Sequence, residues 1–233
     1  FHFGIGHNIT KNGFPEKSSL EQVDIQYDFN YDSDTKGNSN PLDFVYKNQT
    51  QFKDTSSFNY DFRFKSSGKN TTITRKDPIY PFVKIKNRVS ITTDFEAKNY
   101  KYWTYDWRMS FDKSSNYETW DSKGYRKRFF KIAGSLFPSE NIKIRTEFRI
   151  KKEKEWLNWI DSNHLATYDL NQRIVSLNLN WFKGVKHEIR LKSQFVALEA
   201  KRPKSLFTDV NGVLFDSSKK VNPFSSGINS FQI

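Results

Sequence analysis

The stretch "VSLNLNWFKGVKHEIRLKSQFV", residues 175–196, alternates apolar and polar side chains on both sides of a short turn. The apolar positions on either side of "KGVK" are Val175, Leu177, Leu179, Trp181, Ile189, Leu191 and Phe195. The positions between them are mostly polar or charged, and they include Ser176, Asn178, Asn180, Glu188, Arg190, Lys192 and Gln194. Successive side chains of a strand point to opposite faces, so this pattern predicts an antiparallel hairpin with one apolar and one charged face.

Comparable runs occur along most of the chain and predict an all-β fold of about eleven strands in one domain. Besides fragments at each end, we expect strands at Val23 to Tyr31, Leu42 to Phe52, Phe58 to Phe64, Val83 to Phe95, Trp103 to Phe111, Phe130 to Leu136, Ile142 to Ile150, Leu177 to Trp181 and Ile189 to Ala197. Helical spacing is weak everywhere. The best case, "EKEWLNWI" at 153–160, is short enough to be a loop.

Composition restricts the class of protein. Aromatic residues make up 17% of the chain. Cysteine is absent, which excludes disulfides and thiol chemistry. A mean hydropathy of -0.79 and the lack of a long apolar run exclude a spanning helix. They leave open a membrane β-barrel, in which only alternate residues face lipid. The start "FHFGIGHNI" does not read as a signal peptide, and we expect residues 1–233 to be a barrel segment truncated at both ends.

The net charge of +12 would suit a nucleic-acid-binding protein. However, 26 acidic residues are interleaved with the 38 basic ones, and the densest run, "RIKKEKE" at 149–155, is mixed in sign. Aromatic and charged residues also occupy opposite parities, whereas a single-strand binder needs them on one face. We therefore expect solvated charged faces and no nucleic-acid partner.

The connections between the expected strands alternate in length. The short ones are "DTSS" (54–57), "AKN" (97–99), "PSEN" (138–141) and "KGVK" (183–186). The long ones are 32–41, 66–82, 113–125, 153–168 and 201–226. In an antiparallel up-and-down meander this places every short turn at one end and every long loop at the other, as in outer-membrane barrels. The connection at 7–20 falls where a short turn is expected and has no explanation in this scheme.

The strand lengths favour the same class, because a tilted membrane strand needs about 9 to 11 residues. Aromatic residues near strand ends, such as Trp103, Phe111 and Trp181, suit interfacial girdles, although cross-strand core pairs would look alike. We expect the apolar parity to face outer-membrane lipid and the charged parity to face a hydrated lumen. An open edge is not tolerated in lipid, so the barrel would need further strands outside this segment.

The stretches "WLNWIDSNHLATYDLNQ" and "LNLNWFKGVKHEIRLKSQFVALEAK", between Trp156 and Lys201, resemble the C-terminal region of a known protein family, and "YWTYDWRMSF" at 102–111 extends the likeness. It is a family of largely uncharacterised Gram-negative surface proteins, in which a β-sandwich like the family-nine carbohydrate-binding modules precedes an outer-membrane barrel. The resemblance implies that this chain is barrel sequence located in the outer membrane. It brings no catalytic motif, and the sugar-binding module itself is not in this chain.

Several charged residues share the expected lumen parity. These candidate lumen charges are Asp106, Arg108, Arg145, Glu147, Arg149, Glu188, Arg190 and Lys192. Opposed charges across a lumen would create a transverse field that orients a polar or saccharide solute. The alternative is that they are mutually neutralised charges of the wall.

Trp156 and Trp159 in "WLNW" are candidate loop aromatics, either for stacking on sugar rings or for anchoring an outer loop at the membrane interface. The histidines lack the spacing of a metal site, and no nucleophile motif is present, so we expect no metal, no cofactor and no enzymatic activity. The expected function is passage, anchoring or assembly of polar or saccharide material at the outer membrane. The alternative is a soluble β-rich polysaccharide-binding module.

Overall fold

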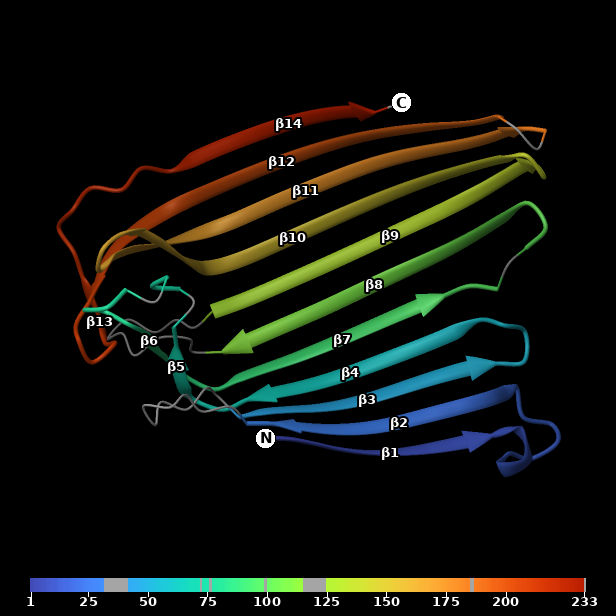
Figure 1. Ribbon diagram of the computed structural model, residues 1–233, viewed down its shortest axis with the longest axis horizontal. Helices are drawn as coiled ribbons and strands as arrows, with labels where there is room; N and C mark the ends of the chain where they lie inside the picture. Colours follow the sequence, from blue (N-terminus) through green and yellow to red (C-terminus); the bar gives the residue numbers. More distant parts are fainter. Residues whose placement is uncertain are drawn as a thin grey trace.

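The computed structural model describes residues 1–31, 42–71, 73–75, 77–98, 100–114, 125–184 and 187–232. The chain forms an antiparallel sheet of twelve strands, in which eleven long strands follow one another as an up-and-down meander (Figure 1). This confirms the predicted all-β meander. The long strands are β1 (His2–Thr10), β2 (Leu20–Asn30), β3 (Asp43–Phe52), β4 (Ser57–Lys65), β7 (Arg88–Glu96), β8 (Trp103–Ser114), β9 (Tyr125–Ser139), β10 (Ile142–Asp161), β11 (His164–Lys183), β12 (His187–Thr208) and β14 (Phe224–Gln232).

The short turns all lie at one end of the sheet, which we call the turn end (Figure 1). The turns β3–β4, β7–β8, β9–β10 and β11–β12 are at this end, as predicted. The β1–β2 connection, which contains a 3-10 helix at Lys11–Gly13, lies there too. The expected long loops at 32–41 and, but for its ends, 113–125 fall outside the described residues. We call the opposite end of the sheet the loop end.

The expected long loop at 153–168 does not exist. Strands β10 and β11 instead continue for 20 residues each and are joined only by Ser162 and Asn163. The register shifts between Glu153 and Trp156, and Glu155 has a left-handed backbone with φ of 55°. A bulge of this kind adds a residue to one strand and breaks the alternation, which made strand sequence resemble a loop.

The expected strand from Val83 to Phe95 is two strands. Val83–Ile85 forms β6, which pairs with β5 (Gly68–Asn70) in a separate two-stranded sheet, and β7 begins only at Arg88. The expected loop at 201–226 is also partly strand, because β12 extends to Thr208 and β13 covers Leu214–Asp216.

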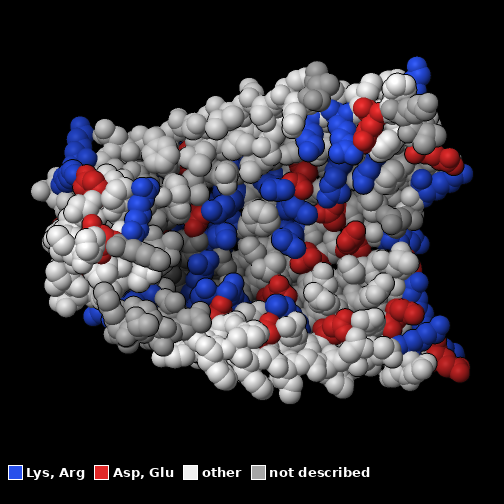
Figure 2. Space-filling model, viewed as in Figure 1, with Lys and Arg blue, Asp and Glu red and all other residues white. Residues whose placement is uncertain are grey.

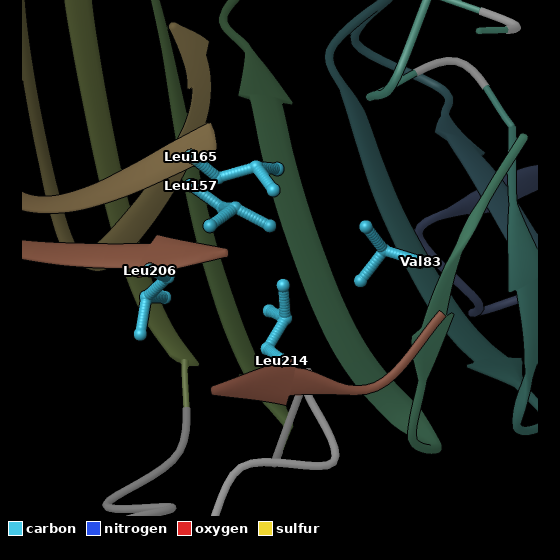
Figure 3. Packing of buried hydrophobic residues seen from close by; sticks show 5 residues of the cluster. All are labelled: Val83, Leu157, Leu165, Leu206 and Leu214. Atoms are coloured by element: carbon cyan, nitrogen blue, oxygen red, sulfur yellow. The ribbon is translucent and has the colours of Figure 1, made fainter. Parts of the chain in front are cut away.

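These additional strands form a small apolar core at the loop end (Figure 3). We define the cap as β5, β6, β13 and the ends of β10, β11 and β12 over residues 156–168 and 200–208. Its buried side chains are Val83, Leu157, Leu165, Leu206 and Leu214. Gly212 joins two parts of it: its carbonyl accepts a hydrogen bond from the Lys84 amide, and with φ of 77° its Cα faces the Phe82 ring. A Cβ on Gly212 would lie 2.5 Å from that ring, so the contact requires glycine.

The sheet is open in the described part of the chain. β1 pairs only with β2, and β14 pairs only with β12, so each presents one unpaired backbone edge. No described helix has the length and apolar character needed to cross a membrane.

Candidate functional site

One face of the sheet carries aligned apolar side chains that are exposed. In an antiparallel register, directly opposite residues share a face. Leu179 is opposite both Ile144 and Leu191, and Val175 is opposite Phe148 and Phe195, so the apolar parity continues from strand to strand. Leu177 is 47% exposed and Phe195 45%. Large apolar side chains open to the surroundings on so many strands define a continuous surface, which we call the apolar band.

The opposite face is polar and much less exposed. Asp28 is 5% exposed, and Ser176, which lies between the exposed Val175 and Leu177, is 9% exposed. Figure 2 shows Lys, Arg, Asp and Glu in the hollowed middle of this face and toward its two ends. A water-soluble sheet buries its apolar face, so here the arrangement is inverted.

Asp106 is the centre of a charged cluster on the polar face. Its two carboxylate oxygens contact Lys131 Nζ and Arg145 Nη2, each at 2.5 Å. Arg145 also donates a hydrogen bond of 3.3 Å to the Ser135 hydroxyl. The cluster therefore links three adjacent strands, β8, β9 and β10.

Apart from Lys192, the other candidate lumen charges form ion pairs. Arg108, which shares one face of β8 with Asp106, lies 3.5 Å from Asp94. Arg149 pairs with Glu147, and Arg190 pairs with Glu188 at 2.5 Å near the turn end. Lys192 lies opposite Asn178 and Gln232 and is exposed.

A polar cavity of about 480 Å³ on the same face was not predicted from the sequence. It is lined by side chains of β2, β3, β4, β7, β8 and β9. The charged lining residues are Asp28, Lys47, Asp61, Arg63, Lys65, Arg88 and Lys127. Lys47 contacts Asp28 at 2.9 Å, and Arg63 forms a two-point contact with Asp43 at the cavity's edge. For the lining residues on β2 to β4, the alternation within each strand was the signal that could have identified them, since these charges occupy the polar parity.

Trp156 and Trp159 do not lie on a loop. They belong to β10, opposite Tyr168 and Leu165 of β11, and both are half-buried. Trp156 packs against the buried Ala166, Tyr168 and Ala200, while the guanidinium of Arg75 lies 4.3 Å from the Trp159 ring centre. These contacts make both tryptophans part of the cap packing, which corrects their assignment as loop aromatics.

His164 and Tyr168 are buried titratable groups of the cap. The ring of His164 has polar contacts on both nitrogens. Its Nε2 lies 2.7 Å from the Ser205 hydroxyl, and its Nδ1 is 3.9 Å from Asp161, which also contacts Lys219 at 2.6 Å. Burial lowers the pKa of His164 below its usual 6.5, and the Lys219 charge lowers it further. Burial likewise raises the pKa of Tyr168. In the described residues, no group of three or more histidine, aspartate or glutamate side chains could hold a metal ion.

Comparisons with protein-family models, with curated proteins and with solved structures find no match for this chain. The resemblance to Gram-negative surface proteins therefore stays a prediction from the sequence.

Proposed function

We propose that this chain forms part of the wall of a β-barrel in the outer membrane of a Gram-negative bacterium, where it serves passage, anchoring or assembly of polar or saccharide material. The inverted burial carries the proposal: large apolar side chains are exposed, while the charged parity holds the partly buried, ion-paired cluster of Asp106, Lys131 and Arg145. Lipid is the solvent that makes this arrangement favourable, because it receives the apolar band and leaves the polar face to a hydrated lumen.

The borders of the apolar band support a membrane location. At the turn end, Tyr100, Trp103 and Tyr105 stack with ring centres 4.1 and 5.8 Å apart. At the loop end, Phe29 and Phe44 pack at 4.9 Å. At about 3.4 Å per residue, the run from Trp103 to the exposed Phe111 is about 27 Å long. This length along the strand, which tilt would shorten across the membrane, is comparable with the apolar band of outer-membrane barrels. That band is about 25 Å tall and is flanked by aromatic girdles.

The unpaired edges of β1 and β14 define what the proposal requires. Backbone groups without partners are very costly in hydrocarbon, so each edge must pair with a further strand in the membrane. Those strands complete the barrel.

The polar face supports a role with polar solutes. Its cavity carries both acidic and basic side chains and suits hydroxyl-rich material through hydrogen bonds to either sign of charge. The cap lies at the loop end, which in outer-membrane barrels faces outward from the cell. In the proposed barrel, the folded cap therefore lies at the mouth between the exterior and the lumen. The proposed role is non-enzymatic and uses no cofactor.

Insertion into membranes tests the proposal. The full protein, folded in detergent and mixed with phospholipid vesicles, is expected to co-float with the vesicles and to show a heat-modifiable gel shift. The proposal would be overturned if the protein were folded and monodisperse in detergent-free buffer and did not bind to vesicles. Together with binding to polysaccharide, that result would favour a soluble polysaccharide-binding module.

A further inference from the structure

On the sheet face that carries the apolar band, the side chains change from apolar to basic just beyond the band at the loop end. The pair Phe130 and Ile150 is followed by Arg128 opposite Lys152, and then by Arg126 opposite Lys154. All four basic side chains are exposed. We call these four residues the basic patch.

The four charges of the basic patch lack acidic partners within the described chain. Acids also line this region, but they are engaged elsewhere: Glu153 pairs with Lys151 at 2.6 Å, Asp169 with Arg202 at 3.3 Å and Glu199 with Lys201 at 3.1 Å. Glu155 lines the region as well. Like charges placed directly opposite each other on neighbouring strands destabilise a sheet. Two such pairs in succession repel each other, and a bound anion would neutralise this repulsion.

The patch is also hollowed. Two adjoining cavities of about 410 and 380 Å³ share Arg126, Lys154, Asp169 and Arg202 in their lining. Lys204 lines the first cavity, and Arg128 and Lys152 line the second. A concave site with several guanidinium and ammonium groups fits a phosphate, which arginine binds through two parallel hydrogen bonds.

We infer that the basic patch binds the phosphate-bearing head group of an anionic lipid in the outward-facing leaflet. This inference rests on the proposed membrane location, because the head groups of that leaflet begin where the apolar band ends. Basic pockets at the border of a membrane protein bind anionic head groups in this way. A lipid also explains why the patch directly continues the apolar rows: acyl chains pack on Phe130 and Ile150 while the phosphate contacts the bases.

The test compares a fourfold variant with a charge-matched control. The variant carries Arg126→Gln, Arg128→Gln, Lys152→Gln and Lys154→Gln. The control changes four exposed lysines at the turn end to glutamine: Lys53, Lys101, Lys143 and Lys183. The full protein is folded into phosphatidylcholine vesicles containing increasing amounts of lipid A, of lipid A without its phosphates, or of added inorganic phosphate. The readout is the midpoint temperature of the heat-modifiable gel shift.

Phosphorylated lipid A is expected to raise the midpoint of the parent and of the control. For the fourfold variant, apparent affinity is expected to fall about five-fold per charge removed, and by more than about 100-fold in total. In phosphatidylcholine alone this variant should be at least as stable as the parent, since the like-charge pairs are gone.

Three results would overturn the inference while leaving the barrel intact: no shift with lipid A, an equal shift without its phosphates, or an equal shift with inorganic phosphate alone. An unchanged affinity of the fourfold variant would also overturn it. Failure of the parent to insert into any vesicle would instead contradict the proposed function.

Discussion

Neighbouring residues on one strand meet different surroundings in this protein. On β11, Val175 and Leu177 are exposed while Ser176 between them is enclosed. The parity of a position therefore determines which substitutions it tolerates, and adjacent positions on β11 provide matched tests.

Leu179→Arg is expected to impair membrane assembly far more than Asn178→Arg. Leu179 lies in the apolar band opposite Ile144 and Leu191, whereas Asn178 shares the polar face with Arg145 and Lys192. An arginine facing lipid near the midplane costs about 2 to 4 kcal/mol, while one in a hydrated lumen costs much less. The measurement is the folded fraction in outer-membrane preparations. Equal losses for the two variants would mean that the lipid face is wrongly assigned.

Asp106→Asn is expected to lower the free energy of unfolding by about 1 to 3 kcal/mol, because it removes the only acid that contacts Lys131 and Arg145 among the described residues. Glu188→Gln is the control, since its pair with Arg190 is open to solvent and contributes less than about 1 kcal/mol. Urea unfolding in vesicles measures both. A smaller effect at Asp106 than at Glu188 would show that the cluster does not stabilise the wall.

The sequence could predict which face of the sheet each candidate lumen charge occupies, but not its partner. Parity along a strand is local, so Asp106 and Arg108 were recognised as sharing a face. Ion pairing depends on the register between strands, which single-strand patterns do not contain. Thus Lys131 of β9 was not among the candidates, and the pairing of Arg108 with Asp94 was not predicted.

The long strands and their short turns were predictable because alternation and turn residues are both local signals. The cap was not. Val83 and Ile85 continue the parity of β7, although the backbone leaves the main sheet there. In β10 and β11, the bulge at Glu155 and burial within the cap hid the strand pattern around Trp156. Elements that pack only against distant segments cannot be recognised from their own sequence.

Acidification is expected to loosen the cap through His164. Its lowered pKa means that the folded cap favours the neutral ring, so the stabilisation is complete above about pH 6.5. It is lost progressively as the pH falls through the lowered folded-state pKa. The protection factors of residues 157–168, which correct for the intrinsic pH dependence of hydrogen exchange, should therefore be lower at pH 5 than at pH 7.5. The same change is expected to be much smaller in His164→Gln and unaltered in His187→Gln, a control at the exposed turn end. Equal acid sensitivity in His164→Gln would contradict this role.

As a whole, the molecule combines an open sheet with a small folded cap. The apolar core of the described residues lies in the cap rather than under the sheet. The long strands thus have an exposed apolar face and a charged face but no apolar layer against which to pack. Closure by further strands in lipid would satisfy both faces and both edges.

Residues 174–180 allow the most direct test of lipid contact. The chain contains no cysteine, so single cysteines can be introduced at successive positions of β11 and labelled with a fluorophore. In vesicles, labels at 175, 177 and 179 are expected to be quenched by spin labels on acyl chains. Labels at 174, 176, 178 and 180 are expected to be quenched only by water-soluble reagents. The central claim is that the apolar band faces lipid. It would be contradicted if quenching did not alternate along the strand, or if labels at the odd positions were quenched only by water-soluble reagents.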